Sequence, residues 1–384
     1  MSASQTAKVS IIIPTHNRCD LLQETLESVR SQIYERWECL VVDDGSTDRT
    51  PEVMRRLSTE DSRIKYHQAP IGRKGAPASR NDGARLATTD YLVFLDSDDL
   101  LAPTALENRM AFMESGSAYD FVAYTGGMFR ERPGDSPFVW NVPTERPVIE
   151  RFLNRDVPWQ TTGPIWRKEF FFEIGGWDEA LLCGQDSELH LRALVARPSY
   201  LHRSEIDHFI RMDNIERGSL GTKSMTVEGQ LAHAEIARMF IKRGDPAMRE
   251  DYSALIAGRL FFHALMILEL HGQEEIERAL LLWRDALNHG QLSPDAHFWG
   301  EVALKNHRRM VGDFAVYYLT KVLPPESRFI DGSWLGKVPL SALNDEIVAR
   351  VLTQPKSFLN SPFQAEIPSY FIRRLKGRIL KAVI

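Results

Sequence analysis

Three carboxylates stand directly after an apolar run in the segment FLDSDDLLAP, residues 94–103. Asp96, Asp98 and Asp99 carry like charges at short spacing, so they repel and raise one another's pKa unless a positive charge lies among them. The segment is therefore either a solvated turn or a cation site. Mg²⁺ and Mn²⁺ prefer hard oxygen ligands, and they commonly bind one or two carboxylates together with phosphate oxygens. We interpret the segment as a platform for a divalent cation and a diphosphate.

Polar residues also end two earlier apolar runs. Thr15 follows the run VSIIIP, and Asp43 and Asp44 end the run WECLVVDD. The continuation GSTD is typical of a turn with a helix cap, because Asp and Ser side chains readily form local hydrogen bonds. For Asp43 this structural alternative stays open.

A regular alternation of strands and helices would position these residues. The expected strands cover 8–14, 37–48, 63–68 and 90–96. The expected helices cover 19–32, with Asp20 as its N-cap, and 50–58, and residues 76–89 are expected to open in a loop and continue as a helix. Such alternation predicts an α/β fold with a mainly parallel sheet flanked by helices. Ligands of these sheets bind at the carboxyl ends of the strands, so the polar residues should meet at one edge.

The remainder of the chain is organised differently. Residues 104–214 suggest antiparallel strands and loops, and helices are expected over 251–272, 274–290, 294–307 and 309–322. We therefore predict a first domain at residues 1–215 and a helical C-terminal region at residues 216–384. The final segment, residues 368–384, has five cations and no acid and predicts a basic amphipathic helix. That helix would bind an anionic membrane surface or dock on protein, and both alternatives stay open.

Composition limits the function further. The net charge of −5 argues against general nucleic-acid binding. Cys19, Cys39 and Cys183 have no metal-ligand spacing and are typical of reduced thiols in a cytoplasmic protein. We find no signal peptide and no membrane-spanning run, so we expect a cytoplasmic protein, with peripheral attachment to the inner membrane face as an option. A homo-oligomer is left open.

Two common nucleotide-binding motifs are absent from the sequence. PTHNR follows the first strand where a dinucleotide-dependent dehydrogenase would have GxGxxG, and no GxxxxGK[ST] is present. A sugar-1-phosphate nucleotidyltransferase would need a basic, glycine-rich loop here, and it remains the alternative enzyme. A non-catalytic nucleotide-binding protein is the alternative without chemistry.

Taken together, the motifs resemble family 2 inverting glycosyltransferases, which have the GT-A fold. The matching segments are VSIIIPTHNR (9–18), VVDDGSTDRT (41–50), ASRNDGARLATTDYLVFLDSDDLLAP (78–103) and GGWDEALLCGQDSELHLRAL (175–194). The resemblance covers about residues 8–214. It implies a nucleoside-diphosphate sugar donor, with UDP expected, and Mn²⁺ or Mg²⁺ as cofactor. It also implies a hydroxyl acceptor on a saccharide or lipid-linked molecule, in polysaccharide or glycoconjugate assembly.

The resemblance assigns roles to single residues. The positions that match nucleotide-sugar contacts are Pro14, Thr15, Asn17, Asp44, Arg80, Asp96, Ser97 and Asp98. Asp96-Ser97-Asp98 matches the family's DXD motif, and Asp98 and Asp99 are the candidate metal ligands. Arg80 is also open to interpretation as part of a surface salt bridge.

The catalytic base that the resemblance implies is Asp186. It would take a proton from the acceptor hydroxyl, and its place at the start of an expected helix would favour its anion. Gln185 stands where the family has Glu, a departure that leaves the base intact. Trp177, in GGWDE, is expected to shape a turn, with stacking on an acceptor sugar as the weaker alternative.

Overall fold

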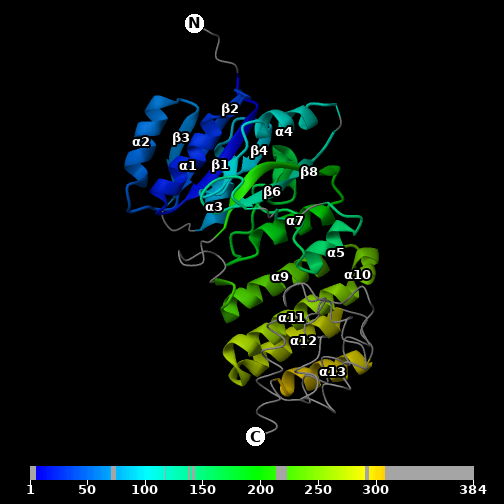
Figure 1. Cartoon of the computed structure of the whole chain (residues 1–384). Coiled ribbons are helices and arrows are strands. Elements are labelled where there is room, and N and C mark those ends of the chain that lie inside the picture. Colours follow the sequence, from blue (N-terminus) through cyan, green and yellow to red (C-terminus); the bar gives the residue numbers. More distant parts are fainter. Residues whose placement is uncertain are drawn as a thin grey trace. The chain divides into compact units, whose positions relative to one another are not determined.

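The computed structural model describes residues 6–70, 75–116, 118–136, 139–140, 143–212, 223–289 and 294–307. The chain forms two compact units (Figure 1): residues up to 152 together with 157–243, and residues 153–156 together with those from 244 onward. The domain boundary predicted between residues 215 and 216 lies outside the described residues, as do the helix expected at 309–322 and the basic segment at 368–384.

The first unit is built on one mixed sheet, with strand order β3-β2-β1-β4-β7-β6-β8-β5. The strands are β1 (Val9–Thr15), β2 (Trp37–Asp43), β3 (Ile64–Gln68), β4 (Tyr91–Phe94), β5 (Leu100–Leu101), β6 (Phe121–Phe129), β7 (Pro164–Arg167) and β8 (Tyr200–Arg211). β1 pairs in parallel with β2 and β4, and β2 with β3. β7 lies between β4 and β6 and is antiparallel to both. The predicted α/β class with a mainly parallel sheet is confirmed.

Helices occupy the connections and the region after the sheet. In chain order they are α1 (Cys19–Arg30), α2 (Thr50–Glu60), α3 (Ala76–Leu86), α4 (Ala105–Met113), α5 (Val148–Leu153), α6 (Lys168–Glu173), α7 (Gln185–Val195), α9 (Val227–Arg243), α10 (Pro246–Asp251), α11 (Ser253–His271), the short 3-10 helix η2 (Gln273–Glu275), α12 (Ile276–His289) and α13 (Pro294–Lys305). Within the part of the chain that the structure describes, no helix is both long enough and apolar enough to cross a bilayer.

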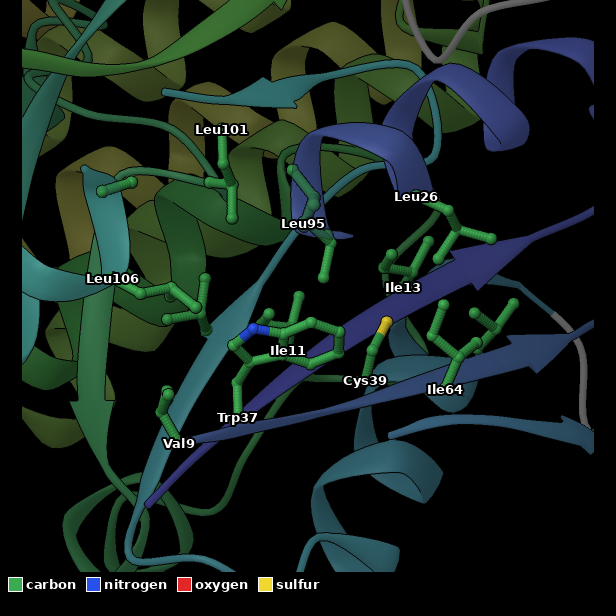
Figure 2. Packing of buried hydrophobic residues seen from close by; sticks show 14 of the residues in the cluster. Val9, Ile11, Ile13, Leu26, Trp37, Cys39, Ile64, Leu95, Leu101 and Leu106 are labelled. Carbon is green, nitrogen blue, oxygen red and sulfur yellow. The ribbon is translucent and has the colours of Figure 1, made fainter. Parts of the chain in front are cut away.

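The residues of β1 alternate between the two faces of the sheet, as strand geometry requires. Ile11 and Ile13 belong to a buried cluster that also holds Leu26 of α1 (Figure 2). Ile12 meets α3 on the other face, where a Cβ on Gly83 would lie 2.4 Å from Ile12 Cγ2. The absence of a side chain at Gly83 therefore lets α3 lie close against the sheet. Helices cover both faces, and the carboxyl ends of the strands stay accessible.

Helix α1 begins without the cap expected from the sequence. Asp20 is exposed and pairs with Arg49 at 3.0 Å, whereas the N–H of Cys19 donates to Asp48 Oδ2 at 3.1 Å. Asp48 comes from the loop after β2, so a neighbouring loop satisfies this free N–H group. The prediction for Asp20 is wrong.

Candidate active site

A cavity of about 1980 Å³ lies in the first unit, where β1, β2 and β4 end. All the predicted donor, metal and base positions line it: Pro14, Thr15, Asn17, Asp44, Arg80, Asp96, Ser97, Asp98, Asp99 and Asp186. Trp177 is the one predicted site residue that is not part of the lining. The sheet thus brings residues from four distant motifs to one place, as expected for a parallel sheet with its ligand site at the strand ends.

The first two carboxylates of the acidic segment are each paired with an arginine. Arg80 Nη2 lies 2.5 Å from Asp96 Oδ1, and its guanidinium is almost completely buried. Arg18, which follows β1, pairs with Asp98. Burial nevertheless raises the pKa of Asp98, because the Arg18 charge only partly offsets the loss of solvent and Asp96 adds repulsion. Two arginines therefore supply positive charge to these carboxylates, where the sequence led us to expect a metal ion.

Asp99 is held inside the protein and differs from its two neighbours. Its Oδ2 accepts hydrogen bonds from Thr162 Oγ1 at 3.1 Å and Gln160 Nε2 at 3.3 Å, and its Oδ1 accepts from the N–H of Arg211 at 3.2 Å. Burial raises the pKa of Asp99 well above the usual value, and the charges of Asp98 and Asp96 raise it further. With both oxygens engaged by protein donors, Asp99 is less suited than Asp98 to bind a metal ion.

Asp44 and Thr15 provide polar groups at the end of the cavity formed by β1 and β2. The N–H of Asp44 donates to the Thr15 carbonyl at 2.9 Å, and Asp44 Oδ2 accepts from the N–H of Gly75 at 2.7 Å. The Thr15 hydroxyl is buried and has no hydrogen-bond partner among the described residues. Buried hydroxyl groups are normally paired, so a ligand is a natural partner for this one.

The loop after β2 is shaped by two residues whose side chains bond to backbone. Asn17 has a φ of 52°, and its Oδ1 accepts from the N–H groups of Thr47 at 2.7 Å and Asp48 at 3.2 Å. Asp43 is buried and accepts from both the N–H and the hydroxyl of Ser46, at 2.9 and 2.6 Å. Asp43 therefore stabilises the turn through hydrogen bonds, which is the structural alternative considered for it. Asn17 stabilises the loop through its side-chain carbonyl.

Asp186 lies in the first turn of α7, after Gly184 with its φ of 70°. Its Oδ1 accepts from the N–H of Ser187 at 2.8 Å. Burial raises the pKa of Asp186, and the Asp96 charge acts in the same direction, while the Ser187 N–H and the Arg80 charge oppose them. The helix N-terminus was expected to favour the anion, but burial outweighs it. A carboxylate with a raised pKa is a stronger base than an ordinary aspartate.

Gln185 does not act as a second acid beside Asp186. Its side chain is buried, and Nε2 donates to the carbonyl of Leu181 at 2.9 Å. An amide can make this bond and an ionised glutamate cannot, so the substitution suits a local structural role.

A sequence model of glycosyl transferase family 2 matches residues 10–173 of the chain. A GalNAc(5)-diNAcBac-PP-undecaprenol beta-1,3-glucosyltransferase of Campylobacter jejuni is 36% identical over 268 residues, which cover 65% of this chain and 79% of that protein. The chain belongs to glycosyl transferase family 2. It is an inverting glycosyltransferase, as the sequence motifs predicted, and the nucleotidyltransferase and non-catalytic alternatives are set aside.

Two further comparisons cover different shares of this glycosyltransferase. An Escherichia coli UDP-Glc:alpha-D-GlcNAc-diphosphoundecaprenol beta-1,3-glucosyltransferase, WfaP, is 38% identical over 111 residues, or 29% of this chain and 43% of that protein. The chain thus spans less than half of that relative's length. The crystal structure of S. aureus TarS 1–349 in complex with UDP-GlcNAc has a TM-score of 0.56 and 17% identity, and covers 86% of this chain and 93% of that one. This likeness shows the fold alone, and it confirms the predicted GT-A architecture.

The Trp177 side chain is packed inside the glycosyltransferase and does not line the cavity. Its side chain is 2% exposed, packs edge-on against Phe94 with ring centroids 5.3 Å apart, and lies under the guanidinium of Arg80 at 4.6 Å. A buried ring has no face to offer to a sugar, so the acceptor-stacking alternative for Trp177 is wrong. The ring instead supports Arg80, which pairs with Asp96.

Two residues that organise this site are not predicted from the sequence. Arg18 lies in PTHNR, and nothing in the sequence indicates that it meets Asp98. Asn81 clamps the GGWDE turn: its Oδ1 accepts from the Trp177 N–H at 2.9 Å, and its Nδ2 donates to the Trp177 carbonyl and to Glu179 Oε1, both at 2.8 Å. The amide directly after Arg80 in SRN was the available signal.

Proposed function

We propose that this glycosyltransferase moves a sugar from a nucleoside-diphosphate sugar, with UDP as the expected nucleotide, to a hydroxyl of a polyprenyl-diphosphate-linked saccharide. The observation that carries the proposal is that Asp98 and Asp186 line one cavity together with the residues after β1 and β2. The names of the C. jejuni and E. coli relatives support the acceptor class, since both act on undecaprenol-linked sugars, and the E. coli name supports UDP.

The nucleoside would lie at the β1–β2 end of the cavity. Asp44 has one carboxylate oxygen bonded to Gly75, and the second, which has no bond to the described residues, could accept from a ribose hydroxyl or a base N–H. Thr15 adds a buried hydroxyl without a protein partner in the described residues. Pro14 and Asn17 would shape this end of the site, and Ser97, between the two acids, would line the path of the diphosphate.

The carboxylates fit a divalent cation only when the donor contributes oxygens. Asp98 is paired with Arg18, whose side chain stays partly exposed, whereas Asp99 is enclosed by protein donors and Asp96 is paired with a buried arginine. In the described residues, no group of three or more His, Cys, Asp and Glu side chains could hold a metal ion. Mg²⁺ and Mn²⁺ commonly bind one or two carboxylates plus substrate phosphates, which matches Asp98 and a diphosphate. Such a cation would offset the charge that develops on the leaving diphosphate.

Asp186 would act as the general base. Its carboxylate lines the cavity at the start of α7, and it would accept the proton of the acceptor hydroxyl as that oxygen forms its bond to the anomeric carbon. The bond from the anomeric carbon to the diphosphate breaks on the opposite side, so configuration inverts in one displacement. No covalent enzyme intermediate is needed, and a second acid at Gln185 is not required.

The direct test measures UDP release and product formation by the purified protein. We expect release of UDP from UDP-glucose or UDP-N-acetylglucosamine to be stimulated by a polyprenyl-diphosphate-linked N-acetylhexosamine, and to be lost with EDTA and restored by Mn²⁺. Absence of turnover with UDP-, GDP- and dTDP-sugars under these conditions would contradict the proposal. Turnover that is insensitive to EDTA would remove the metal from it.

Attachment to membranes through residues 368–384 remains a proposal that rests on the sequence alone. The measurement is co-sedimentation with anionic liposomes, comparing the full chain with a variant that ends at Pro368. Equal binding by the two proteins would exclude the membrane role.

A further inference from the structure

Trp140 presents an apolar ring to the cavity of the candidate active site. Its side chain is 40% exposed, and it lines the same cavity as Asp98 and Asp186. The backbone N–H donates to the Gly126 carbonyl at 2.8 Å, and the indole N–H donates to the Val157 carbonyl at 3.1 Å. Because the only polar atom of the side chain is already paired, the indole offers its ring surface and no hydrogen bond.

The position of Trp140 separates it from the nucleoside end of the cavity. Val139 bridges to Gly127 of β6, whereas Asp44 follows β2, and the strands β1, β4 and β7 lie between β2 and β6 in the sheet. Neighbouring strands are about 4.8 Å apart, so β2 and β6 are separated by four spacings, or roughly 19 Å, and a residue paired with β6 lies roughly 14 Å or more from β2. The indole therefore lies across the sheet from Asp44, where the nucleoside is proposed to bind.

Trp140 is instead connected to the carboxylate end of the cavity. Its indole is anchored on Val157, and three residues further along the chain Gln160 donates to Asp99 Oδ2 at 3.3 Å. Leu182, four positions before Asp186, is 37% exposed and lines the same cavity. Apolar surface from Trp140, Val157 and Leu182 therefore lines the same cavity as Asp186.

An apolar ring in a cavity that also holds a catalytic carboxylate matches the chemistry of a pyranose. The C–H groups of a sugar ring form an apolar face that packs on an aromatic ring, while its hydroxyl groups point outward from the edge. Neither a diphosphate nor a divalent cation would form a favourable contact with such an apolar surface. The observed chemistry thus fits a second sugar better than it fits any part of the nucleotide.

We propose that Trp140 is the platform for the acceptor: the terminal sugar ring of the acceptor stacks on the indole with its reacting hydroxyl directed to Asp186. This inference rests on the proposed function, because it needs an acceptor saccharide in the cavity. It assigns to Trp140 the role that the sequence suggested for the buried Trp177.

The test compares Trp140→Ala and Trp140→Phe with the wild-type protein in steady-state kinetics. The acceptors are N-acetylglucosamine diphosphate on an undecaprenyl chain and on a short alkyl chain, with UDP-glucose as donor. We expect the acceptor KM of Trp140→Ala to rise roughly tenfold with both acceptors, the scale of one lost aromatic contact, and that of Trp140→Phe to rise less. The donor KM and donor hydrolysis without acceptor should stay at the wild-type level. Phe172→Ala is the matched control, since Phe172 is 38% exposed and is not among the residues that line the cavity.

Three results would overturn the inference. An unchanged acceptor KM with normal donor turnover would show that the ring does not touch the acceptor. A rise in the donor KM would place the ring against the nucleotide sugar, and a rise limited to the undecaprenyl acceptor would place it against the lipid. If the wild-type protein shows no donor turnover at all, the proposed function fails and the inference falls with it, a result distinct from the other three.

Discussion

The guanidinium of Arg18 pairs with the carboxylate of Asp98, although 80 residues separate them in the sequence. The pairing follows from the fold, since Arg18 comes after β1 and Asp98 after β4, and these strands are parallel neighbours. A cation that binds Asp98 must therefore compete with an arginine. Binding of a metal cation at Asp98 therefore depends on its competition with the Arg18 guanidinium.

We predict that Arg18→Gln binds Mn²⁺ alone about fivefold more tightly than the wild type, because a partly exposed ion pair contributes up to about 1 kcal/mol. Asp98→Asn should lose Mn²⁺-dependent binding of UDP while the fold is retained, as strand-end carboxylates contribute little to the core. Titration calorimetry with Mn²⁺, with UDP, and with both ligands measures these effects. Equal Mn²⁺ affinity of Arg18→Gln and wild type would show that the arginine does not compete for Asp98.

Asn81 is expected to stabilise the first unit through its clamp on the GGWDE turn. Asn81→Ala removes two buried hydrogen bonds at Trp177 and a partly buried one at Glu179, and should lower the free energy of unfolding by about 2 kcal/mol or more. Asn81→Asp should be worse than Ala, because its second oxygen would face the Trp177 carbonyl and the Glu179 carboxylate. Urea unfolding measures which of the two variants is less stable. If Asn81→Asp were more stable than Asn81→Ala, the assigned orientation of the amide would be contradicted.

A buried ion pair joins α4 to β8. Arg109 Nε and Nη2 donate to Asp207 Oδ2 and Oδ1 at 2.6 and 2.9 Å, and both side chains are almost fully buried. Asp207→Asn leaves the arginine charge without its counter-charge, and we expect a loss of about 3–5 kcal/mol in the free energy of unfolding. The control is Arg49→Gln, which breaks the exposed pair with Asp20 and should cost less than about 1 kcal/mol. Similar losses in the two variants would contradict the account.

The sequence was informative where one local pattern decides the structure. Apolar runs such as VSIIIP and YLVF become β1 and β4, and the polar residues after them line one cavity because parallel strands end at the same edge. Strand order could not be read in this way: β7 enters between β4 and β6 from residues 164–167, and the pairing depends on contacts between distant segments.

Side-chain roles in the site were harder to predict, because burial and partner choice are tertiary properties. Asp98 and Asp99 are identical neighbours in sequence, yet one meets an arginine and the other is enclosed by Thr162 and Gln160. Trp177 lies in a conspicuous motif and is buried, whereas Trp140, in a stretch without a recognised motif, lines the cavity. Residue type and spacing alone do not distinguish these cases.

The raised pKa of Asp186 predicts the pH dependence of turnover. Burial raises the pKa of this carboxyl. On acidification it therefore becomes protonated at a higher pH than an ordinary aspartate, whose pKa is about 3.9. Because the base works only when ionised, kcat should fall as the pH drops through that raised value and should level off above it. The pH profile of kcat with saturating donor and acceptor shows this limb. An acid limb at or below about pH 3.9 would contradict the assignment.

The central claim is that Asp186 removes the acceptor proton, and the substitution Asp186→Asn tests it most directly. Asn keeps the shape of the side chain and suits the first turn of α7 about as well, so folding and donor binding should be preserved. The decisive measurement is the rate of sugar transfer under saturating conditions, together with the affinity for UDP and Mn²⁺ by calorimetry. We expect normal ligand affinity and transfer at least ~10²-fold slower than wild type, the usual scale for loss of a general base. Near-normal transfer by Asp186→Asn would contradict it and leave Asp186 as a structural residue at the start of α7.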